Sequence, residues 1–425
     1  MTLLVFVGSL LGAMAIGVPV AFSLMFCGVI LMWYMGMFNT QIIAQNMIQG
    51  ADTFTLLAIP FFILAGELMN SGGLSRRIID FAIALVGHIR GGLGIVAIVA
   101  AVIMASISGS AAADTAALAA ILIPMMAKAG YNVPRSAGLI ASGGIIAPVI
   151  PPSMAFIVFG VAANVSITQL FMAGIVPGLL MGISLVGTWL FVVRKDNIQP
   201  LPKTSGKERL SATFKAGWAL GMPVIILGGI KAGIMTPTEA AVVAAAYALF
   251  VGVFIYRELK PSDLGHVFLR AAKSTAIIMF LVCAALVSAW LITAANIPNE
   301  IVGYIEPLID RPILLMFAIM VLVLIVGTAL DLTPTILILT PVLMPIIMKA
   351  GINPVYFGVL FIMNTCIGLI TPPVGVVLNV VSGVGRVPLG KVTVGVVPFL
   401  LAQVAVLFLL VLFPDIVLVP LKYLR

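Results

Sequence analysis

A chain of 425 residues in which 62% of the positions are hydrophobic and only 8% are charged cannot cover its surface with polar side chains, which excludes an ordinary water-soluble fold. The formal net charge of +8 does not indicate nucleic-acid binding, because basic residues collect in the cytoplasmic loops of bacterial membrane proteins for reasons of topology. The cysteines, Cys27, Cys283 and Cys366, lie in apolar segments without paired spacing, so neither disulfides nor a metal site is expected. We therefore expect a multi-pass protein embedded in the lipid bilayer.

In chain order, the first apolar segment runs from Leu3 to Phe38 with a break at Gly17-Val18-Pro19, which predicts either one tilted helix or two short ones. Crossing a bilayer takes about 20 apolar residues. Segments of this kind are predicted at 56–72, 167–193, 216–230, 237–256, 273–296 and 393–418. Residues 75–90 and 257–272 are more polar, and we predict that they form helices lying at the cytoplasmic membrane surface.

Two pairs of apolar stretches are too short for separate spans. Residues 92–105 and 116–128 flank the polar sequence SISGSAAADT, and as helical arms each would be roughly 20 Å long. We predict a re-entrant hairpin over 92–128 with its tip at 106–115, because irregular backbone at membrane depth must be enclosed by protein. The same pattern around GTALDLTPT, with arms at 312–330 and 336–348, predicts a second hairpin over 312–348.

Each predicted hairpin precedes an apolar segment that is too long for a simple span, 135–165 and 355–384. GGIIAPVIPPS interrupts the first segment and GLITPPVG the second, which predicts two broken helices. Proline has no amide hydrogen and clashes with the carbonyl four residues before it. We therefore expect free main-chain carbonyls at Gly144, Ala147, Gly368 and Leu369, and such carbonyls attract cations at the membrane midplane.

The two halves of the chain correspond residue by residue. Each member of one set recurs 221 positions later in the other: Pro124, Lys128, Gly130, Asn132 and Pro151-Pro152 as Pro345, Lys349, Gly351, Asn353 and Pro372-Pro373. Five predicted spans separate the hairpins, and an odd number inverts the second copy. An all-α membrane fold of two inverted-topology repeats, each with a hairpin and a broken helix, is typical of alternating-access transporters.

The distribution of Lys and Arg agrees with this topology, since both residues should crowd the cytoplasmic side. The loop 194–215 is strongly basic, and we place it in the cytoplasm. Of the 22 Lys and Arg residues, the predicted spans then place only the following on the opposite side: Lys231, Arg311, Lys349, Lys422 and Arg425. The segment 39–55 and the acidic stretch NEIVGYIEPLID are also predicted outside.

These predictions divide the chain into five parts. They are the N-terminal membrane helices with an interfacial helix (1–91), the first repeat (92–193), a cytoplasmic loop with scaffold helices (194–311), the second repeat (312–418) and a tail (419–425).

Several motifs between residues 61 and 379 follow one another in a family-specific order: FFILAGELMNSGG, ISGSAAADTAA, GLIASGGIIAPVIPPS, GGIKAGIMTPTEAAVVAAAYAL, LTPTILILTPVLMP and GLITPPVGVVLN. With them the chain resembles the large membrane (M) subunit of tripartite ATP-independent periplasmic (TRAP) transporters. The resemblance implies a bacterial inner-membrane protein with a sodium-coupled elevator mechanism. It also implies two partners, a small four-helix membrane subunit (Q) and a periplasmic solute-binding protein (P). Relatives of this kind import small organic anions such as sialic acid, keto-sugar acids or C4-dicarboxylates.

Polar groups at the predicted tips and breaks form the candidate site. The candidate cation ligands are Ser106, Ser108, Ser110, Gly144, Ala147, Thr328, Asp331, Thr333, Thr335, Gly368 and Leu369. The candidate substrate contacts are Asp114, Thr115, Ser153, Thr371 and Asn379. Asp114 and Asp331 have two open interpretations, because a carboxylate at such a tip either caps the following helix or holds a cation. Sodium is the expected coupling ion, and no cofactor is expected.

Two further acidic residues have mainly structural interpretations. Glu67 lies within a predicted span beside Gly66 and Asn70, which favours an interhelical hydrogen bond over a coupling role. Thr236-Pro237-Thr238-Glu239 has the pattern of a capping box with proline at the first helical position.

Rival classes have less support. The sequence contains no HExxH, GxSxG, P-loop or Cys/His metal pattern, so an enzyme is not expected. Hairpins that meet broken helices favour an alternating site over a channel with a continuous pore. The closest alternative is a stand-alone sodium/dicarboxylate symporter that needs no binding protein. The exterior segments 39–55 and 297–311 are too short for a capture domain of about 100 residues, so capture is external or occurs at the membrane site.

Overall fold

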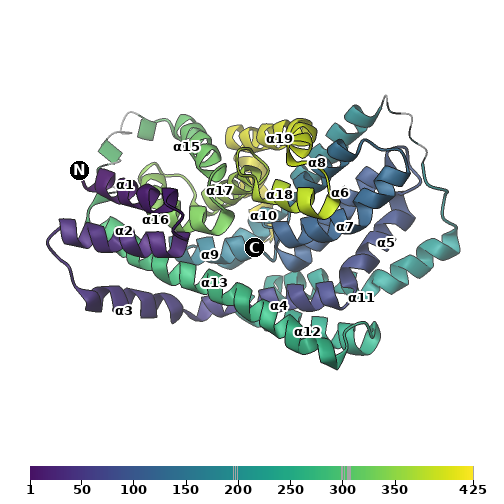
Figure 1. The fold of residues 1–425 in the computed structure, drawn as a ribbon, viewed down its shortest axis with the longest axis horizontal. Helices are drawn as coiled ribbons and strands as arrows, with labels where there is room; N and C mark the ends of the chain where they lie inside the picture. The colour runs from purple at the N-terminus through teal and green to yellow at the C-terminus, as the bar shows by residue number, and fades with distance from the viewer. Residues whose placement is uncertain are drawn as a thin grey trace.

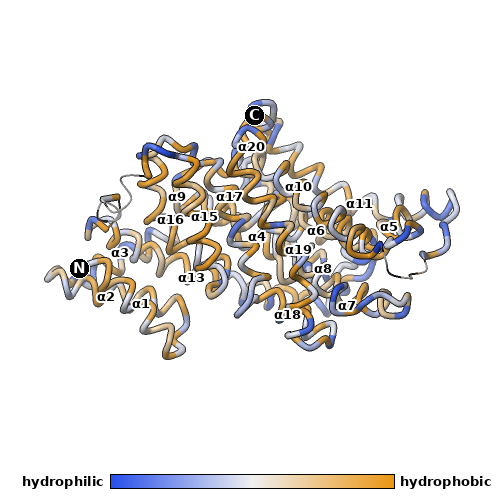
Figure 2. Tube along the Cα trace, turned by 90° about the horizontal axis from the view of Figure 1, so that it is seen from above, coloured by the Kyte–Doolittle hydropathy of each residue, from blue (hydrophilic) through white to orange (hydrophobic). Residues whose placement is uncertain are grey.

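The computed structural model describes residues 1–194, 196, 198, 200–297, 300, 302–303 and 308–424. Within this part of the chain every regular element is a helix (Figure 1). Among these described residues, the helices that are long and apolar enough to cross a membrane number 8. Figure 2 shows hydrophobic residues along most helices and hydrophilic residues mainly at helix ends and connections. The chain is therefore a multi-pass, all-α membrane protein.

The first set of helices, called here the scaffold group, comes from the N-terminal part and the middle of the chain. Its members are α1 (Thr2–Ala15), α2 (Val20–Tyr34), α3 (Thr40–Ala51), η1 (Phe54–Leu57), α4 (Ala58–Ser71), α5 (Leu74–Val86), α11 (Gly206–Lys231), α12 (Pro237–Phe250), η2 (Val251–Ile255) and α13 (Pro261–Ala294). The 34-residue α13 packs against α2, α3 and α4, while α12 packs on α4 and α11 packs on α5.

The second set, called here the repeat group, contains both predicted hairpins and both predicted broken helices. Its members are α6 (Gly92–Ser108), α7 (Ala111–Lys128), α8 (Val133–Gly144), α9 (Met154–Ala163), α10 (Ile167–Val193), α15 (Pro312–Gly327), α16 (Leu332–Lys349), α17 (Pro354–Gly368), α18 (Val376–Gly385), α19 (Leu389–Leu412) and α20 (Asp415–Leu424). The two groups meet chiefly where α5 packs on α6 and where α13 packs on α16.

The halves of the repeat group have matching helix boundaries. Ser110 is the N-cap of α7, and Asp331, 221 residues later, is the N-cap of α16. Asn132 and Asn353 cap α8 and α17 through their side-chain oxygens. Both Pro-Pro breaks contain a cis peptide bond. The repeat found in the sequence is therefore a structural repeat.

The two repeats interlock. α9 packs against α16 and α18 packs against α7, so the second half of each broken helix lies on the hairpin of the other repeat. α19 likewise packs along α8, and α10 packs along α17. These contacts are close, because a Cβ atom on Gly385 of α18 would lie 2.5 Å from Cδ1 of Ile123 in α7. Each repeat therefore completes the packing of the other.

The N-terminal apolar segment forms two helices, α1 and α2, which is one of the two alternatives predicted for it. Other predicted boundaries are wrong. Residues 257–272 form no separate interfacial helix, because α13 starts with Pro261 at its first turn and continues to Ala294. The predicted span 393–418 ends early, since α19 stops at Leu412 before Pro414, and the predicted tail belongs to α20. Proline explains where α13 starts and where α19 ends, since it favours the first turn of a helix and opposes the continuation of a helix.

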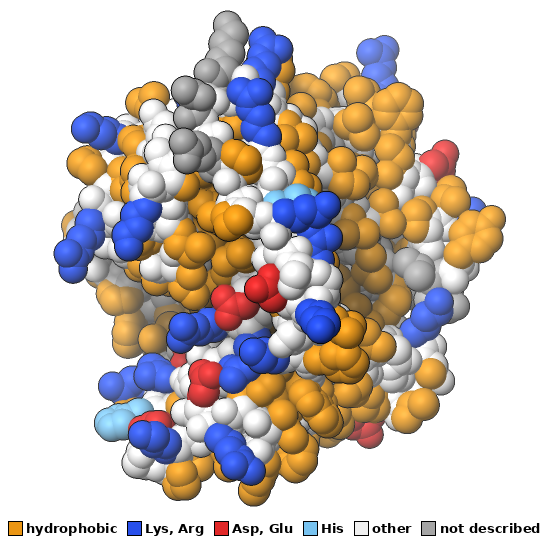
Figure 3. Space-filling view, turned by 90° about the vertical axis from the view of Figure 1, so that its right-hand side faces the viewer, with side chains coloured by type: hydrophobic (Ala, Val, Ile, Leu, Met, Phe, Trp, Pro, Cys, Tyr) orange, Lys and Arg blue, Asp and Glu red, His pale blue; other side chains and the backbone are white. Residues whose placement is uncertain are grey.

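Basic side chains gather at the right-hand end of the molecule in Figure 1, and Figure 3 shows this face, called here the basic face. The segments 75–90 and 257–272, both predicted at the cytoplasmic surface, contact each other, since Arg77 Nη1 lies 2.7 Å from Glu258 Oε1. This grouping agrees with the predicted topology. Lys195, Arg425 and half of the acidic stretch 299–310 lie outside the described residues.

Candidate functional site

The tip of the first hairpin is shorter than predicted. α6 continues to Ser108 and α7 starts at Ala111, so the non-helical tip is Gly109-Ser110 rather than 106–115. Gly109 has a φ of +60°, and a Cβ atom there would lie 3.0 Å from the Pro152 carbonyl oxygen. Glycine is needed at this turn because it adopts positive φ without steric cost and leaves room for the first broken helix.

Ser108 and Asp114 form the polar centre of this hairpin. The Ser108 hydroxyl donates to Asp114 Oδ1 at 2.5 Å and accepts the Ser110 amide at 3.1 Å. The side chain that caps α7 is Ser110, which accepts the Ala113 amide at 3.4 Å. The geometry therefore does not favour helix capping as the role of Asp114.

Two oxygen atoms beside this centre lack a partner. Asp114 and Thr115 are fully buried, and Asp114 Oδ2 and Thr115 Oγ1 make no hydrogen bond within the described part of the chain. Buried polar atoms are nearly always hydrogen-bonded, so each exception calls for an explanation such as a ligand or ion. Ser106, by contrast, uses its hydroxyl to donate to the Ile103 carbonyl of its own helix at 2.6 Å.

The first break, between α8 and α9, packs directly onto this hairpin. A Cβ atom on Gly144 would overlap Oγ1 of Thr115, and one on Gly143 would lie 3.2 Å from Cβ of Ala101. Ser153 caps α9 by accepting the Phe156 amide at 3.3 Å and donates to the Pro148 carbonyl at 2.5 Å. Ser153 therefore closes the break with a hydrogen bond across it.

The prediction that proline leaves the carbonyls free is wrong for three of the four. The Gly144 carbonyl accepts the Ala147 amide at 3.2 Å, that of Gly368 accepts Thr371 at 3.0 Å, and that of Leu369 accepts Val377 at 3.1 Å. The reason is that the chain turns tightly within each break and brings other amides to these oxygens. The Ala147 carbonyl accepts no main-chain hydrogen bond from the described residues. Because a carbonyl oxygen has two lone pairs, cation binding at the other three stays a prediction.

The second hairpin meets its break through two glycines, and a Cβ atom on Gly368 would lie 2.5 Å from the Gly327 carbonyl oxygen. Asp331 is exposed and caps α16, accepting the Leu332 amide at 2.8 Å. The Thr328 hydroxyl donates to Ile325 and that of Thr335 to Asp331, each at 2.8 Å to a main-chain oxygen. Thr333 is half-buried in the first turn of α16.

The two half-sites differ in exposure. Residues 143–153 of the first break are buried, whereas Pro372, Pro373 and Val374 of the second break are exposed. Thr371 is half-buried and donates to the Ile367 carbonyl at 2.8 Å, and Asn379 is exposed and donates to that of Val374 at 2.7 Å. The candidate substrate contacts are thus divided between a buried and an open half-site.

Two residues near the site, Asn364 and Gly66, are not among the site residues predicted from the sequence. Asn364 of α17 is buried, donates to the Met320 carbonyl at 2.6 Å and has an Oδ1 without a partner among the described residues. It lies 221 positions after Gly143, so the repeat spacing was the signal that pointed to it. Gly66 of α4 also approaches the first tip, since a Cβ atom there would lie 3.7 Å from Cα of Ser108.

The structural interpretations of Glu67 and Glu239 are confirmed. Glu67 of α4 accepts from Arg270 of α13 at 2.9 Å, which makes an interhelical ion pair. Thr236 and Glu239 form the reciprocal hydrogen bonds of a capping box at the start of α12.

Two interlocked repeats whose hairpin tips pack against broken helices define a class, the membrane transport proteins built from repeats. Within this class, the chain belongs to the family described as tripartite ATP-independent periplasmic transporter, DctM component, whose model matches residues 7–416. The chain is therefore a transport protein of the bacterial inner membrane and not an enzyme.

Comparison with known proteins gives relatives over the full length. The chain is 55% identical to the 2,3-diketo-L-gulonate TRAP transporter large permease protein YiaN of Escherichia coli, covering 100% of both chains. It is 40% identical to the sialic acid TRAP transporter large permease protein SiaM of Vibrio cholerae, covering 95% of each. Among solved structures, the Alcanivorax borkumensis YdaH transporter has a similar fold, with a TM-score of 0.64 at 15% identity over 88% of this chain and 87% of that one.

Proposed function

We propose that this chain is the translocating subunit of a TRAP transporter and imports a small organic anion by a sodium-coupled elevator movement. The observation that carries the proposal is the buried centre of the first hairpin, where Asp114 Oδ2 and Thr115 Oγ1 lack partners. Hard cations such as sodium prefer oxygen ligands, and a buried carboxylate is costly unless a cation or proton accompanies it. We place the proposed substrate contacts in the open second half-site, at Thr371 and Asn379.

The proposed substrate class is a sugar-derived keto acid. The support is the 55% identity over the whole chain to a permease named for 2,3-diketo-L-gulonate. Sialic acid and C4-dicarboxylates are the other candidates within the predicted class, and the sialic acid permease is less similar at 40% identity. All three carry carboxylates, and the two sugar-derived acids also carry hydroxyl and carbonyl groups, which hydroxyl and amide side chains recognise by hydrogen bonds.

The proposed partners are a small four-helix membrane subunit and a periplasmic binding protein that delivers the anion. Two properties of the chain support them. The described exterior segments include no capture domain, and the scaffold group exposes large apolar side chains of α11 and α12, among them Phe214, Val224 and Phe250. A partner helix or lipid must cover such side chains in the membrane.

The test is uptake by the complete complex in liposomes, with the binding protein supplied outside together with labelled 2,3-diketo-L-gulonate, sialic acid or a C4-dicarboxylate. We expect import of the keto acid when sodium is higher outside and little import when potassium replaces sodium. Equal rates in both salts would refute sodium coupling. Import of only one of the other anions would refute the substrate class and leave the coupling intact.

A further inference from the structure

The scaffold group and the repeat group are joined by three covalent connections. Two of them lie on the basic face: residues 87–91 lead from α5 into α6, and residues 194–205 lead from α10 into α11. Residues 195, 197 and 199 of the second connection, and part of the third, which leads from α13 to α15, lie outside the described residues. Any movement of the repeat group against the scaffold group must be accommodated in these connections.

The first two connections are joined at the end near the scaffold group. The Thr204 hydroxyl donates to the Ala84 carbonyl of α5 at 2.7 Å. Arg209 Nε donates to the same hydroxyl at 3.2 Å, and its Nη2 lies 3.5 Å from Nδ1 of His88. The Leu201 side chain packs on Gly87, where a Cβ atom would lie 3.3 Å from Leu201 Cδ1.

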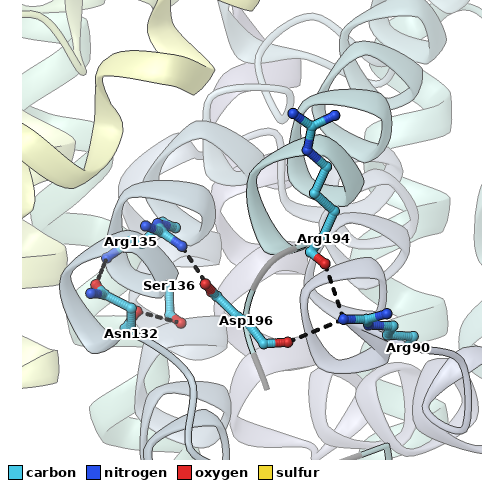
Figure 4. Close-up of polar contacts among 6 residues, drawn as sticks. All are labelled: Arg90, Asn132, Arg135, Ser136, Arg194 and Asp196. Atoms are coloured by element: carbon cyan, nitrogen blue, oxygen red, sulfur yellow. Dashed lines mark hydrogen bonds and ion pairs between the residues drawn. The ribbon is translucent and has the colours of Figure 1, made fainter. Parts of the chain in front are cut away.

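They are joined again at the end near the repeat group, as Figure 4 shows. Arg90 Nη2 donates to the main-chain carbonyls of Arg194 at 3.0 Å and Asp196 at 3.3 Å. The carboxylate of Asp196 in turn pairs with Arg135 Nη1 of α8 at 2.8 Å. The exit of α10 is thereby tied both to the entry of α6 and to the first broken helix.

Glycines give the connection 87–91 its close packing against α10. The Trp189 indole donates to the Gly91 carbonyl at 2.8 Å, and Gly91 has a φ of +73°. A Cβ atom on Gly92 would overlap the Gly87 carbonyl, and one on Gly94 would overlap the Trp189 ring. A glycine-rich joint has little stiffness of its own, so its position depends on the contacts at its two ends.

We propose that Arg90 and Thr204 fasten the two connections into one paired strap, which positions the repeat group and bends as a unit during transport. Arginine suits this role because its guanidinium presents several donors in a fixed plane and binds two carbonyls at once. The fastening is a property of the isolated chain, whereas its effect on uptake rests on the function proposed above.

The test measures hydrogen exchange of the full-length chain in detergent and uptake by the reconstituted complex, for Arg90→Ala, Arg90→Lys and Thr204→Val. In Arg90→Ala we expect exchange to rise about fivefold in both connections, because loss of a hydrogen bond opens the segment that it held. The maximal uptake rate should fall about fivefold with a KM within about twofold of wild type, since substrate contacts are untouched. Lysine at position 90 should restore only part of the rate, because its ammonium group lacks the fixed planar donors that bind both carbonyls. Thr204→Val should loosen both connections in the same way.

The matched control is Arg194→Ala, because only the main-chain carbonyl of Arg194 takes part in the strap. Its guanidinium lies 4.2 Å from the Phe191 ring centroid, away from Arg90. This control should leave exchange and uptake unchanged. A rise in exchange confined to 87–91 would overturn the paired strap, and so would an unchanged maximal rate in Arg90→Ala. If the wild-type complex shows no uptake, the proposed function fails, and the exchange data alone decide on the strap.

Discussion

Asp114 is the residue on which the candidate site depends most. Its carboxyl group is fully buried, one oxygen accepts from Ser108 and the other has no partner in the described chain. Burying an unpaired carboxylate costs several kcal/mol of free energy or more, and a bound cation can offset this cost. Asp114 is therefore the residue on which the proposed cation site rests, and Ser108 is the neighbour that holds its carboxylate in place.

Replacing Ser108 by alanine should weaken sodium binding. The hydroxyl holds Asp114 Oδ1 at 2.5 Å, and a hydrogen bond to a charged group contributes about 1.5–3 kcal/mol. We expect the sodium concentration for half-maximal uptake to rise about tenfold or more. Ser142→Ala is the control, because that buried hydroxyl donates within its own helix to Gly138 at 2.9 Å. An unchanged sodium dependence in Ser108→Ala would remove Ser108 from the ion site.

Replacing Gly144 by alanine should destabilise the first half-site. Its Cβ atom would overlap Thr115 Oγ1, and overpacking of this kind costs about 1–3 kcal/mol. We expect a lower melting temperature in detergent and a large loss of uptake. The matched control is Gly187→Ala in α10, where a Cβ atom meets nothing within 4 Å and alanine favours the helix. Equal melting temperatures for the two variants would contradict the close packing of Thr115 on Gly144.

At the scale of elements, α6, α7 and α16 are longer than the predicted hairpin arms, whereas α15 ends at Gly327, before the predicted limit at residue 330. α7 and α16 have 18 residues each and are long enough to cross a membrane by length and composition alone. α6 with 17 residues and α15 with 16 are slightly shorter. The two-residue tip at Gly109-Ser110 and the packing of α6 on α7 nevertheless give the first pair the form of a hairpin.

Cysteine labelling tests whether the hairpins enter from opposite sides. Single cysteines are introduced at Ala129 and Ala350, each the C-cap residue after a hairpin. A membrane-impermeant reagent should label one of them in inside-out vesicles and the other in right-side-out vesicles. The native cysteines Cys27, Cys283 and Cys366 are buried, so the unmodified chain serves as the background control. Labelling of both positions from the same face would refute the inverted topology.

At the scale of the whole molecule, the interlocked repeats form one packed body that contains both half-sites. The scaffold group touches this body chiefly through α5 on α6 and α13 on α16. Exposed apolar side chains such as Phe214 and Phe250 remain on its outer helices. An elevator requires a scaffold that stays fixed in the bilayer, and added partner helices would widen it.

The chain reconstituted alone should not transport, although it should insert and fold. The expected uptake in a sodium gradient is at background level without the small subunit and the binding protein, and appears when both are added. The measurement is accumulation of labelled anion in liposomes, with the complete complex as the positive control. Robust uptake by the chain alone would favour the stand-alone symporter instead.

The sequence by itself determined the membrane class, most of the spans and the repeat. These features are local: a run of apolar residues has a length that either matches the bilayer or does not, and the 221-residue correspondence from Pro124 to Pro345 is visible without any contact. Capping signals such as Thr236 with Glu239 are also local, and they were interpreted correctly.

Only the tertiary structure decided which polar atoms are available at the site. Ser106 and Thr335 looked equivalent to Ser108 in the sequence, yet both hydroxyls are taken by carbonyls of the local helix, while Ser108 bonds Asp114. The carbonyls of Gly144 and Gly368 accept hydrogen bonds from main-chain amides within the breaks. The packing of each broken helix on the other repeat's hairpin joins segments that are far apart in the sequence, α9 with α16 and α7 with α18. Hydrogen bonds and packing depend on such distant neighbours, which composition and periodicity do not specify.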